Sequence, residues 1–223
     1  MVRIHKITLK KVTEVLFLNL FLFPIYPDNL KPSFIVLFLI ATVYNTLNKE
    51  TKTINSDSKI TSLLIINSSV FILLLLSLMY SDNLVFGLKY IFRLLPLLLF
   101  PIAFFLLKDN KNIFSFKLFV KAKLCFYIST LTLFTAIFFI FYFRGVVTEN
   151  YFLNYSYRII YQLGLYSMHP IYASLITSIS IIFSISLFKI KRYKLIVILG
   201  NILLVLNLIL LSRKSAIIIM CIL

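Results

Sequence analysis

Acidic residues, glycine and tryptophan are scarce in this sequence. Its 223 residues include 7 Asp and Glu, 4 Gly and no Trp, and 13% of the residues are charged. An ordinary water-soluble domain has about 25% charged residues, because polar side chains cover its surface. The shortage of charge excludes such a domain. What the sequence has instead is 61% hydrophobic residues and a mean hydropathy of +1.01, which predict a chain surrounded mainly by lipid.

Cysteine is also scarce, and motifs for catalysis or metal binding are missing. The 2 cysteines, Cys125 and Cys221, lie in apolar runs, which excludes a disulfide framework. The sequence has no Walker motif, GxGxxG, HExxH, CxxC or GxSxG. A metal ion needs several converging ligands, and one histidine near the membrane with few carboxylates does not supply them. We therefore predict neither a metal site nor a bound cofactor.

Long apolar runs dominate the sequence, and seven of them are candidate membrane spans, each needing about 20 mostly apolar residues. The runs cover residues 12–26, 32–47, 60–80, 88–107, 122–143, 169–188 and 195–212. Pro96 and Pro101 predict a kink in the fourth run. An eighth run, from Ser215 to Leu223, would extend about 14 Å, roughly half of the hydrocarbon core. We expect an all-α, polytopic transmembrane helix bundle with seven spans and the start of an eighth, forming one incomplete domain over residues 1–223.

Basic residues alternate from loop to loop. Lys and Arg accumulate on the cytoplasmic side of membrane proteins. They are dense in residues 3–11, 49–59, 108–123 and 189–194 and sparser in the intervening loops, which predicts a cytoplasmic N-terminus. The basic start leads into the first apolar run without a small-residue cleavage site, so we expect this run to be retained. A re-entrant hairpin of the first two runs would leave the later orientation unchanged.

The net charge of +16 would suit nucleic acid, anionic lipid or an anionic substrate. A nucleic-acid-binding protein gathers its charge on one soluble face, whereas here the charge is divided among the loops. We therefore predict membrane lipids as partners and no nucleic acid. The predicted location is the bacterial inner (cytoplasmic) membrane, with multiple passes.

Several basic residues break the alternation because they lie on the predicted outer side. Arg93 is inside or at the mouth of the fourth run, Arg158 is in the long outer loop 144–168, and Arg213 with Lys214 separates the last two runs. Ionisable side chains at membrane depth mark functional sites by default, and the arginine fork matches phosphate oxygens. The alternative is that these side chains snorkel to the interface. The tyrosines of the outer loop fit an aromatic belt or a sugar-stacking surface.

His169 and Pro170 open the sixth run. The histidine fits a helix cap, since proline is favoured in the first helical turn, or a residue that lines a substrate site. Within the spans, Asn67, Asn201 and Asn207 fit hydrogen bonds between helices better than ligands. We assign no catalytic residue. The candidate substrate-binding residues are Arg93, Arg158, His169, Arg213 and Lys214.

The segment from His169 to Leu223 resembles a known family. A His-Pro start leads into HPIYASLITSISIIFSISLF, the basic turn KIKRYK follows, and a second apolar run ends in Ser212-Arg213 before a third begins. This order is similar to the core of the O-antigen ligase and O-antigen polymerase superfamily, whose core region would start at residues 169–223. The family has a glycine after the arginine, where this chain has Lys214. Upstream, LKYIFRLLPLLLFPIAFFLL resembles the family's fourth-span region.

The resemblance implies a membrane glycosyltransferase of lipopolysaccharide and other cell-surface polysaccharide biosynthesis. Such enzymes transfer a glycan from an undecaprenyl-pyrophosphate carrier, at the periplasmic face, to a hydroxyl of lipid A core (ligases) or of another glycan (polymerases). Arg213 matches the family's motif arginine, which would neutralise the pyrophosphate leaving group. The family's large periplasmic loop, with a catalytic histidine, would follow Leu223. We therefore expect this chain alone to be inactive.

The alternative function is a multi-spanning transporter or an exporter of lipid-linked glycan. Transporters have inverted repeats and broken helices with polar residues at mid-membrane. The fourth run has kinking prolines, but the sequence shows no matching repeat. The sequence does not separate ligase from polymerase.

Overall fold

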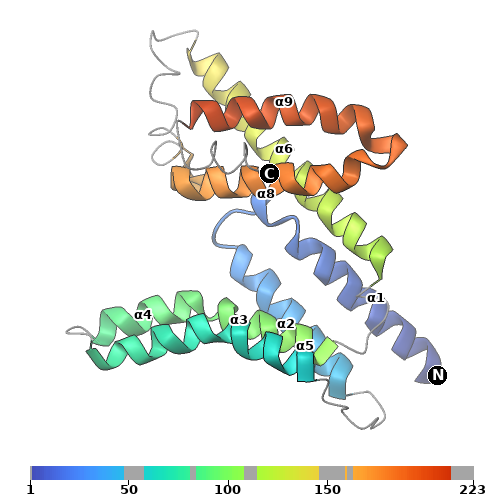
Figure 1. Cartoon of the computed structure of the whole chain (residues 1–223), viewed down its shortest axis with the longest axis vertical. Coiled ribbons are helices and arrows are strands. Elements are labelled where there is room, and N and C mark those ends of the chain that lie inside the picture. The colour runs from blue at the N-terminus through green and yellow to red at the C-terminus, as the bar shows by residue number, and fades with distance from the viewer. Residues whose placement is uncertain are drawn as a thin grey trace. The chain divides into compact units, whose positions relative to one another are not determined.

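The structure is a computed structural model that describes residues 2–47, 58–80, 84–107, 115–145, 159 and 163–211. Every regular element among these residues is helical, which confirms the all-α class (Figure 1). The longer helices are α1 (Val2–Leu20), α2 (Lys31–Leu47), α3 (Ser58–Ser77), α4 (Leu84–Leu94), α5 (Pro96–Leu107), α6 (Phe116–Gly145), α8 (Pro170–Phe188) and α9 (Lys194–Leu210). Short 3₁₀ helices are η1 (Phe23–Ile25), η2 (Leu78–Tyr80), η4 (Gly164–Tyr166) and η5 (Lys191–Tyr193).

The chain divides into two compact units. The first unit comprises Met1–Leu16 and Ile35–Phe114, and the second comprises Phe17–Phe34 and Ser115–Leu223. The second unit therefore contains α6, α8 and α9 together with the connection between α1 and α2. We call α6, α8 and α9 the three-helix group.

The described residues include three helices that are long and apolar enough to cross a membrane. They cover Phe116–Phe143, Pro170–Phe188 and Lys191–Leu210, and they correspond to the fifth, sixth and seventh expected spans. The first of them begins earlier than the sequence predicted, because Ser115 caps it: the Leu118 N–H donates to Ser115 Oγ at 3.3 Å. Lysine favours helix interiors and carries its ammonium to the interface on a long stem, so Lys117 and Lys121 do not end the helix.

The first, second and fourth expected spans are shorter or interrupted, whereas the third is covered by α3, with 20 residues, and by η2. Helix α1 ends at Leu20, so residues 12–26 are not one helix. Helix α2 has 17 residues. The kink expected in the fourth run is a break, because α4 ends at Leu94 and α5 starts at Pro96 and has 12 residues. Proline lacks the N–H that would continue the helical ladder. The full count of seven spans and the cytoplasmic N-terminus stay predictions.

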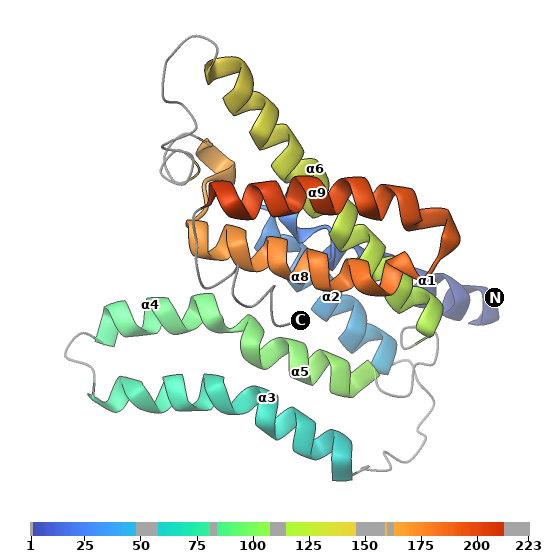
Figure 2. The same ribbon diagram turned by 45° about the horizontal axis from the view of Figure 1, so that its top comes forward.

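In the first unit, α3 packs along both α5 and α4, and Figure 2 shows these helices side by side. Phe71 of α3 and Ala103 and Leu107 of α5 are buried. The rings of Phe38 in α2 and Phe104 in α5 are 6.5 Å apart. The burial of these apolar side chains holds the unit together.

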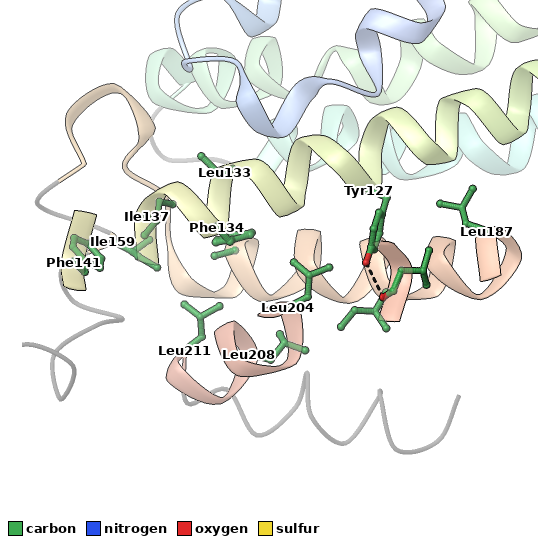
Figure 3. Packing of buried hydrophobic residues seen from close by; sticks show 13 residues of the cluster. Tyr127, Leu133, Phe134, Ile137, Phe141, Ile159, Leu187, Leu204, Leu208 and Leu211 are labelled. Atoms are coloured by element: carbon green, nitrogen blue, oxygen red, sulfur yellow. Dashed lines mark hydrogen bonds between the residues drawn. The ribbon is translucent and has the colours of Figure 1, made fainter. Parts of the chain in front are cut away.

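In the second unit, α6 contacts both α8 and α9, and α8 packs antiparallel to α9. Its core is a cluster of buried side chains from all three helices, seen in Figure 3. The cluster includes Tyr127, Phe134, Phe141, Leu187, Leu204, Leu208 and Leu211.

The connection between α1 and α2 packs against the first half of α6. The rings of Phe17 and Phe119 are 5.9 Å apart. Ser129 Oγ donates to the Phe21 carbonyl oxygen at 3.3 Å, and η1 contacts α6 as well. The turn between α1 and α2 therefore lies beside the first half of α6.

Candidate functional site

His169 is the N-cap of α8. Its Nδ1 accepts a hydrogen bond from the Ile171 N–H at 3.3 Å, and Pro170 occupies the first helical turn. Its carbonyl oxygen also accepts from the Tyr172 N–H at 2.9 Å. The side chain is exposed, and its ring lies edge-on to that of Tyr172 at 6.3 Å. The cap places the ring proton on Nε2, so the histidine presents a hydrogen-bond donor to whatever approaches this end of α8.

The remaining predicted site residues are not brought together by the described structure. Arg93 is in α4, in the first unit, next to the break before Pro96. His169 is in the second unit. Arg158, Arg213 and Lys214 lie outside the described residues.

The end of α9 is nevertheless close to His169 in the fold. Asn207 Nδ2 donates to Thr177 Oγ1 at 3.0 Å, which pairs the second half of α9 with the first half of α8. Leu211, the last described residue, is buried in the core cluster with Phe141 and Ile159. Leu211 therefore lies at the end of the three-helix group where His169 caps α8. We call this end the histidine end.

A second polar contact joins all three helices nearer the opposite end. Tyr127 Oη lies 3.1 Å from the Val197 carbonyl oxygen, the dashed line in Figure 3, and 3.2 Å from Asn201 Oδ1. Asn201 Nδ2 donates to Ser184 Oγ at 2.9 Å. The predicted hydrogen bonds between helices are thus confirmed for Asn201 and Asn207, while the side chain of Asn67 lies outside the described ones.

Two residues of this contact had no role in the sequence prediction. Tyr127 is fully buried and supplies the hydroxyl that joins α6 to α9. Gly200 leaves the room for it, because a Cβ at this position would overlap Tyr127 Oη and come within 3.0 Å of Leu131 Cδ2. Two features of the sequence could have indicated this contact. One is a tyrosine close to Ser129 and Thr130 inside an apolar run, and the other is a single glycine inside another apolar run.

Helix α8 turns a face of small and hydroxylated residues toward its partners. Ala173, Thr177, Ser180 and Ser184 are all buried and follow one another at helical spacing. Small residues let helices approach closely in membranes. Thr177 and Ser184 satisfy their hydroxyls on backbone carbonyls of α8, whereas Ser180 Oγ has no partner in the described structure. This face therefore serves packing.

A hollow of about 100 Å³ lies between α6 and α9. Its walls are apolar apart from Thr135 and Asn207, and the Asn207 amide is already bonded to Thr177. The apolar wall residues are Leu131, Phe134, Phe138, Phe139, Leu203, Leu204 and Leu206. Such a hollow fits a hydrocarbon segment better than a polar substrate.

The end opposite to His169 is strongly basic, and we call it the basic end. It combines the first half of α6 with the turn between α8 and α9, since Tyr127 contacts Val197 and the Lys123 ammonium lies over the Phe183 ring. Lys117 and Lys121 are exposed on α6. The other members are Lys123, Lys189, Lys191, Arg192 and Lys194. Positive charge thus gathers at one end of the group.

Nothing in the described part of the chain resembles a metal centre. No group of three or more His, Cys, Asp and Glu side chains forms there. The described residues offer hydrogen-bond donors at the histidine end and cations at the basic end, which are groups that bind anionic oxygen. No family model, curated protein or solved structure matches this chain.

Proposed function

We propose that the chain is a membrane glycosyltransferase that moves a glycan from undecaprenyl pyrophosphate to a hydroxyl acceptor at the outer face of the bacterial cytoplasmic membrane, as an O-antigen ligase or polymerase does. One observation carries the proposal. The antiparallel pairing of α8 with α9 puts the capped His169 and Leu211, the residue that precedes Ser212-Arg213 in the sequence, at the same end of the group. These are the residues on which the family resemblance rests.

The reaction breaks the bond between the donor sugar's anomeric carbon and the pyrophosphate oxygen. The acceptor hydroxyl forms the new glycosidic bond and loses its proton to a base, and undecaprenyl pyrophosphate leaves with the bonding electrons. Arg213 would neutralise the negative charge that develops on this leaving group. Lys214, Arg158 and Arg93 are the further proposed contacts to the donor. His169 would donate from Nε2, since its Nδ1 is held in the cap.

The charge distribution supports an orientation for the three-helix group. Basic residues favour the cytoplasmic side, so the basic end faces the cytoplasm and the histidine end faces outward. In the proposed glycan transfer, the glycan of the polyprenyl-linked donor lies on the outer side of the membrane. His169 and Arg213 would have to lie on that side to contact the donor. The acceptor is lipid A core or another glycan.

We also propose that α1 and α2 form a re-entrant hairpin. Phe17 contacts α6 at Phe119, near its start, and Phe21 contacts it at Ser129, near the middle of the span Phe116–Phe143. Two full spans would put this turn beyond the outer end of α6. The hairpin enters from the basic side, and the ion pair of Lys31 with Asp28 lies in its turn. The later helices keep their orientation.

Deleting the gene in its own host tests the function against the transporter alternative. If the protein is a transferase, surface polysaccharide should be lost and the lipid-linked glycan should accumulate on the outer face, where an added glycosidase digests it in intact spheroplasts. An exporter would instead leave the lipid-linked glycan inside and protected. Loss of attachment to lipid A core would identify a ligase, and loss of long repeat ladders a polymerase.

A further inference from the structure

We propose that the basic end of the three-helix group binds the headgroup of an anionic phospholipid from the adjoining leaflet. The site is independent of the proposed glycan transfer, which takes place at the histidine end. Its ligand is a phosphodiester with net negative charge, such as phosphatidylglycerol. Cations of different helices converge at this end.

Helix α8 gathers cations from both of its neighbours. Lys123 of α6 has its Nζ 5.9 Å from the centre of the Phe183 ring, and Lys194 of α9 has its Nζ 5.2 Å from the centre of the Phe188 ring. The Phe183 ring also packs edge-on against Phe126 of α6 at 5.5 Å. Cation–π contacts of this kind hold ammonium groups in place. Two lysines are thus positioned beside the last turns of α8 rather than dispersed in solvent.

The same end carries the positive poles of two helices. Helices α6 and α9 both begin there, and neither has an acidic residue in its first turn. Instead, Lys117 follows the first residue of α6, and Lys194 is the first residue of α9. Cations at a helix N-terminus oppose the helix dipole. A bound anion would offset both the dipoles and the mutual repulsion of the side chains.

The described part of the second unit contains no carboxylate that could do this. Its acidic side chain is Asp28, which is paired with Lys31. No ion pair joins a carboxylate to Lys123, Lys189 or Lys194 within the described residues.

The surroundings of the cations favour a lipid over a soluble anion. Exposed apolar side chains follow directly from the basic turn along both helices: Ile185 and Phe188 on α8, and Leu195, Ile196 and Leu199 on α9. Acyl chains would lie against this surface while the phosphate lies among the ammonium groups. Basic residues beside spanning helices on the cytoplasmic side bind anionic headgroups in this way.

The test uses the whole chain, purified in a mild detergent. Native mass spectrometry would measure the retention of phosphatidylglycerol against phosphatidylcholine with the same acyl chains. Lys123→Gln with Lys194→Gln removes the two positioned cations. Lys10→Gln with Lys11→Gln removes the same charge from α1, where both lysines are exposed. Lys191→Gln with Arg192→Gln, on the exposed turn, provides a second variant if the first does not fold.

We expect the parent chain and the α1 control to prefer phosphatidylglycerol. The variants of the basic end should lose about fivefold in relative retention for each cation removed, since a basic residue near an anionic surface contributes about 1 kcal/mol. Added salt should weaken the preference. Equal retention by parent and both variants, or no preference over phosphatidylcholine, would overturn the proposal. So would preferential capture of an RNA oligonucleotide in competition with the lipid.

Discussion

The three-helix group and the first unit are both made of apolar helices, yet their asparagine side chains differ in hydrogen bonding. In the three-helix group, Asn201 and Asn207 bond across helices, to Ser184 and Thr177. In the first unit, Asn45 Nδ2 is buried without a partner in the described structure. Bonds between helices supply specificity in a membrane, where apolar contact alone does not distinguish protein from lipid.

Helix continuity differs in the same sense. Helices α6, α8 and α9 are unbroken, with 30, 19 and 17 residues. In the first unit, α3 has 20 residues, but the run that follows it is divided at Leu95 into α4 and α5, with 11 and 12 residues. Unbroken helices with cross-helix bonds make a fixed framework for residues at their ends. The three-helix group, which carries both the histidine end and the basic end, therefore serves as this framework.

The strongest test of the comparison concerns the turn between α1 and α2. In a chain whose native cysteines are replaced by serine, Lys191→Cys and Tyr166→Cys should react with a membrane-impermeant maleimide from opposite sides. Asn29→Cys should not react from the side that labels Tyr166→Cys, because the turn of the re-entrant hairpin lies beside the middle of α6 and does not reach the outer face. Labelling of Asn29→Cys together with Tyr166→Cys would instead support two complete spans.

The contact of Gly200 with Tyr127 should be the most sensitive point of packing. Gly200→Leu would force Tyr127 out of its position between α6 and α9, and overpacking of this kind typically costs about 1–3 kcal/mol. Unfolding of the purified protein in mixed detergent micelles would measure the loss. Leu199→Ile, a change at a neighbouring residue that is 56% exposed, serves as the control and should leave stability nearly unchanged. Equal stability of the two variants would contradict the described packing.

The same substitution should have opposite effects in the two regions. Asn207→Leu breaks the bond to Thr177 and should destabilise the protein by about 0.6 kcal/mol, and by no more than about 1.7 kcal/mol. Asn45→Leu removes a buried Nδ2 that lacks a partner in the described structure, so stability should stay equal or rise by about 1 kcal/mol. Both variants would be compared by the same unfolding assay. A loss at Asn45 as large as that at Asn207 would remove the distinction between the regions.

The smallest effect is expected at Ser180. Its hydroxyl is buried on the packing face of α8 without a partner, so Ser180→Ala should change the free energy of unfolding by less than about 0.5 kcal/mol. Thr177→Val, on the same face, removes the acceptor of Asn207 and should cost more. Reversal of this order would mean that Ser180 has a partner that the packing does not reveal.

Much of the helical architecture was predictable from the sequence, because apolar runs and basic loops report directly on spans. The runs 122–143, 169–188 and 195–212 correspond to the three helices of the structure that are long and apolar enough to cross a membrane. The interhelical roles of Asn201 and Asn207 were predictable as well, since amides inside spans need partners. The early end of α1 at Leu20 was missed because the run stays apolar through Phe23, although Pro24, which lacks the N–H that would continue the helix, was an available signal.

The candidate site was predictable only in part. A histidine before a proline indicates a helix start, and His169 is the N-cap of α8. The basic end was visible as loop charge, but its convergence required the antiparallel pairing of α8 with its neighbours. Tyr127 has its role because Gly200 lies opposite to it on another helix, seventy-odd residues away in the chain. A pairing over that distance leaves no local pattern in the sequence.

The central claim is that the protein transfers a glycan from a polyprenyl pyrophosphate. The most direct measurement reconstitutes the protein from its complete gene into vesicles with radiolabelled lipid-linked glycan and acceptor, and follows both the glycosylated acceptor and free undecaprenyl pyrophosphate. We predict that the two products appear in equal amounts, that Arg213→Ala abolishes both, and that Arg213→Lys is impaired because an ammonium lacks the bidentate fork. Movement of intact lipid-linked glycan across the vesicle membrane, without release of undecaprenyl pyrophosphate, would contradict the claim and identify a transporter.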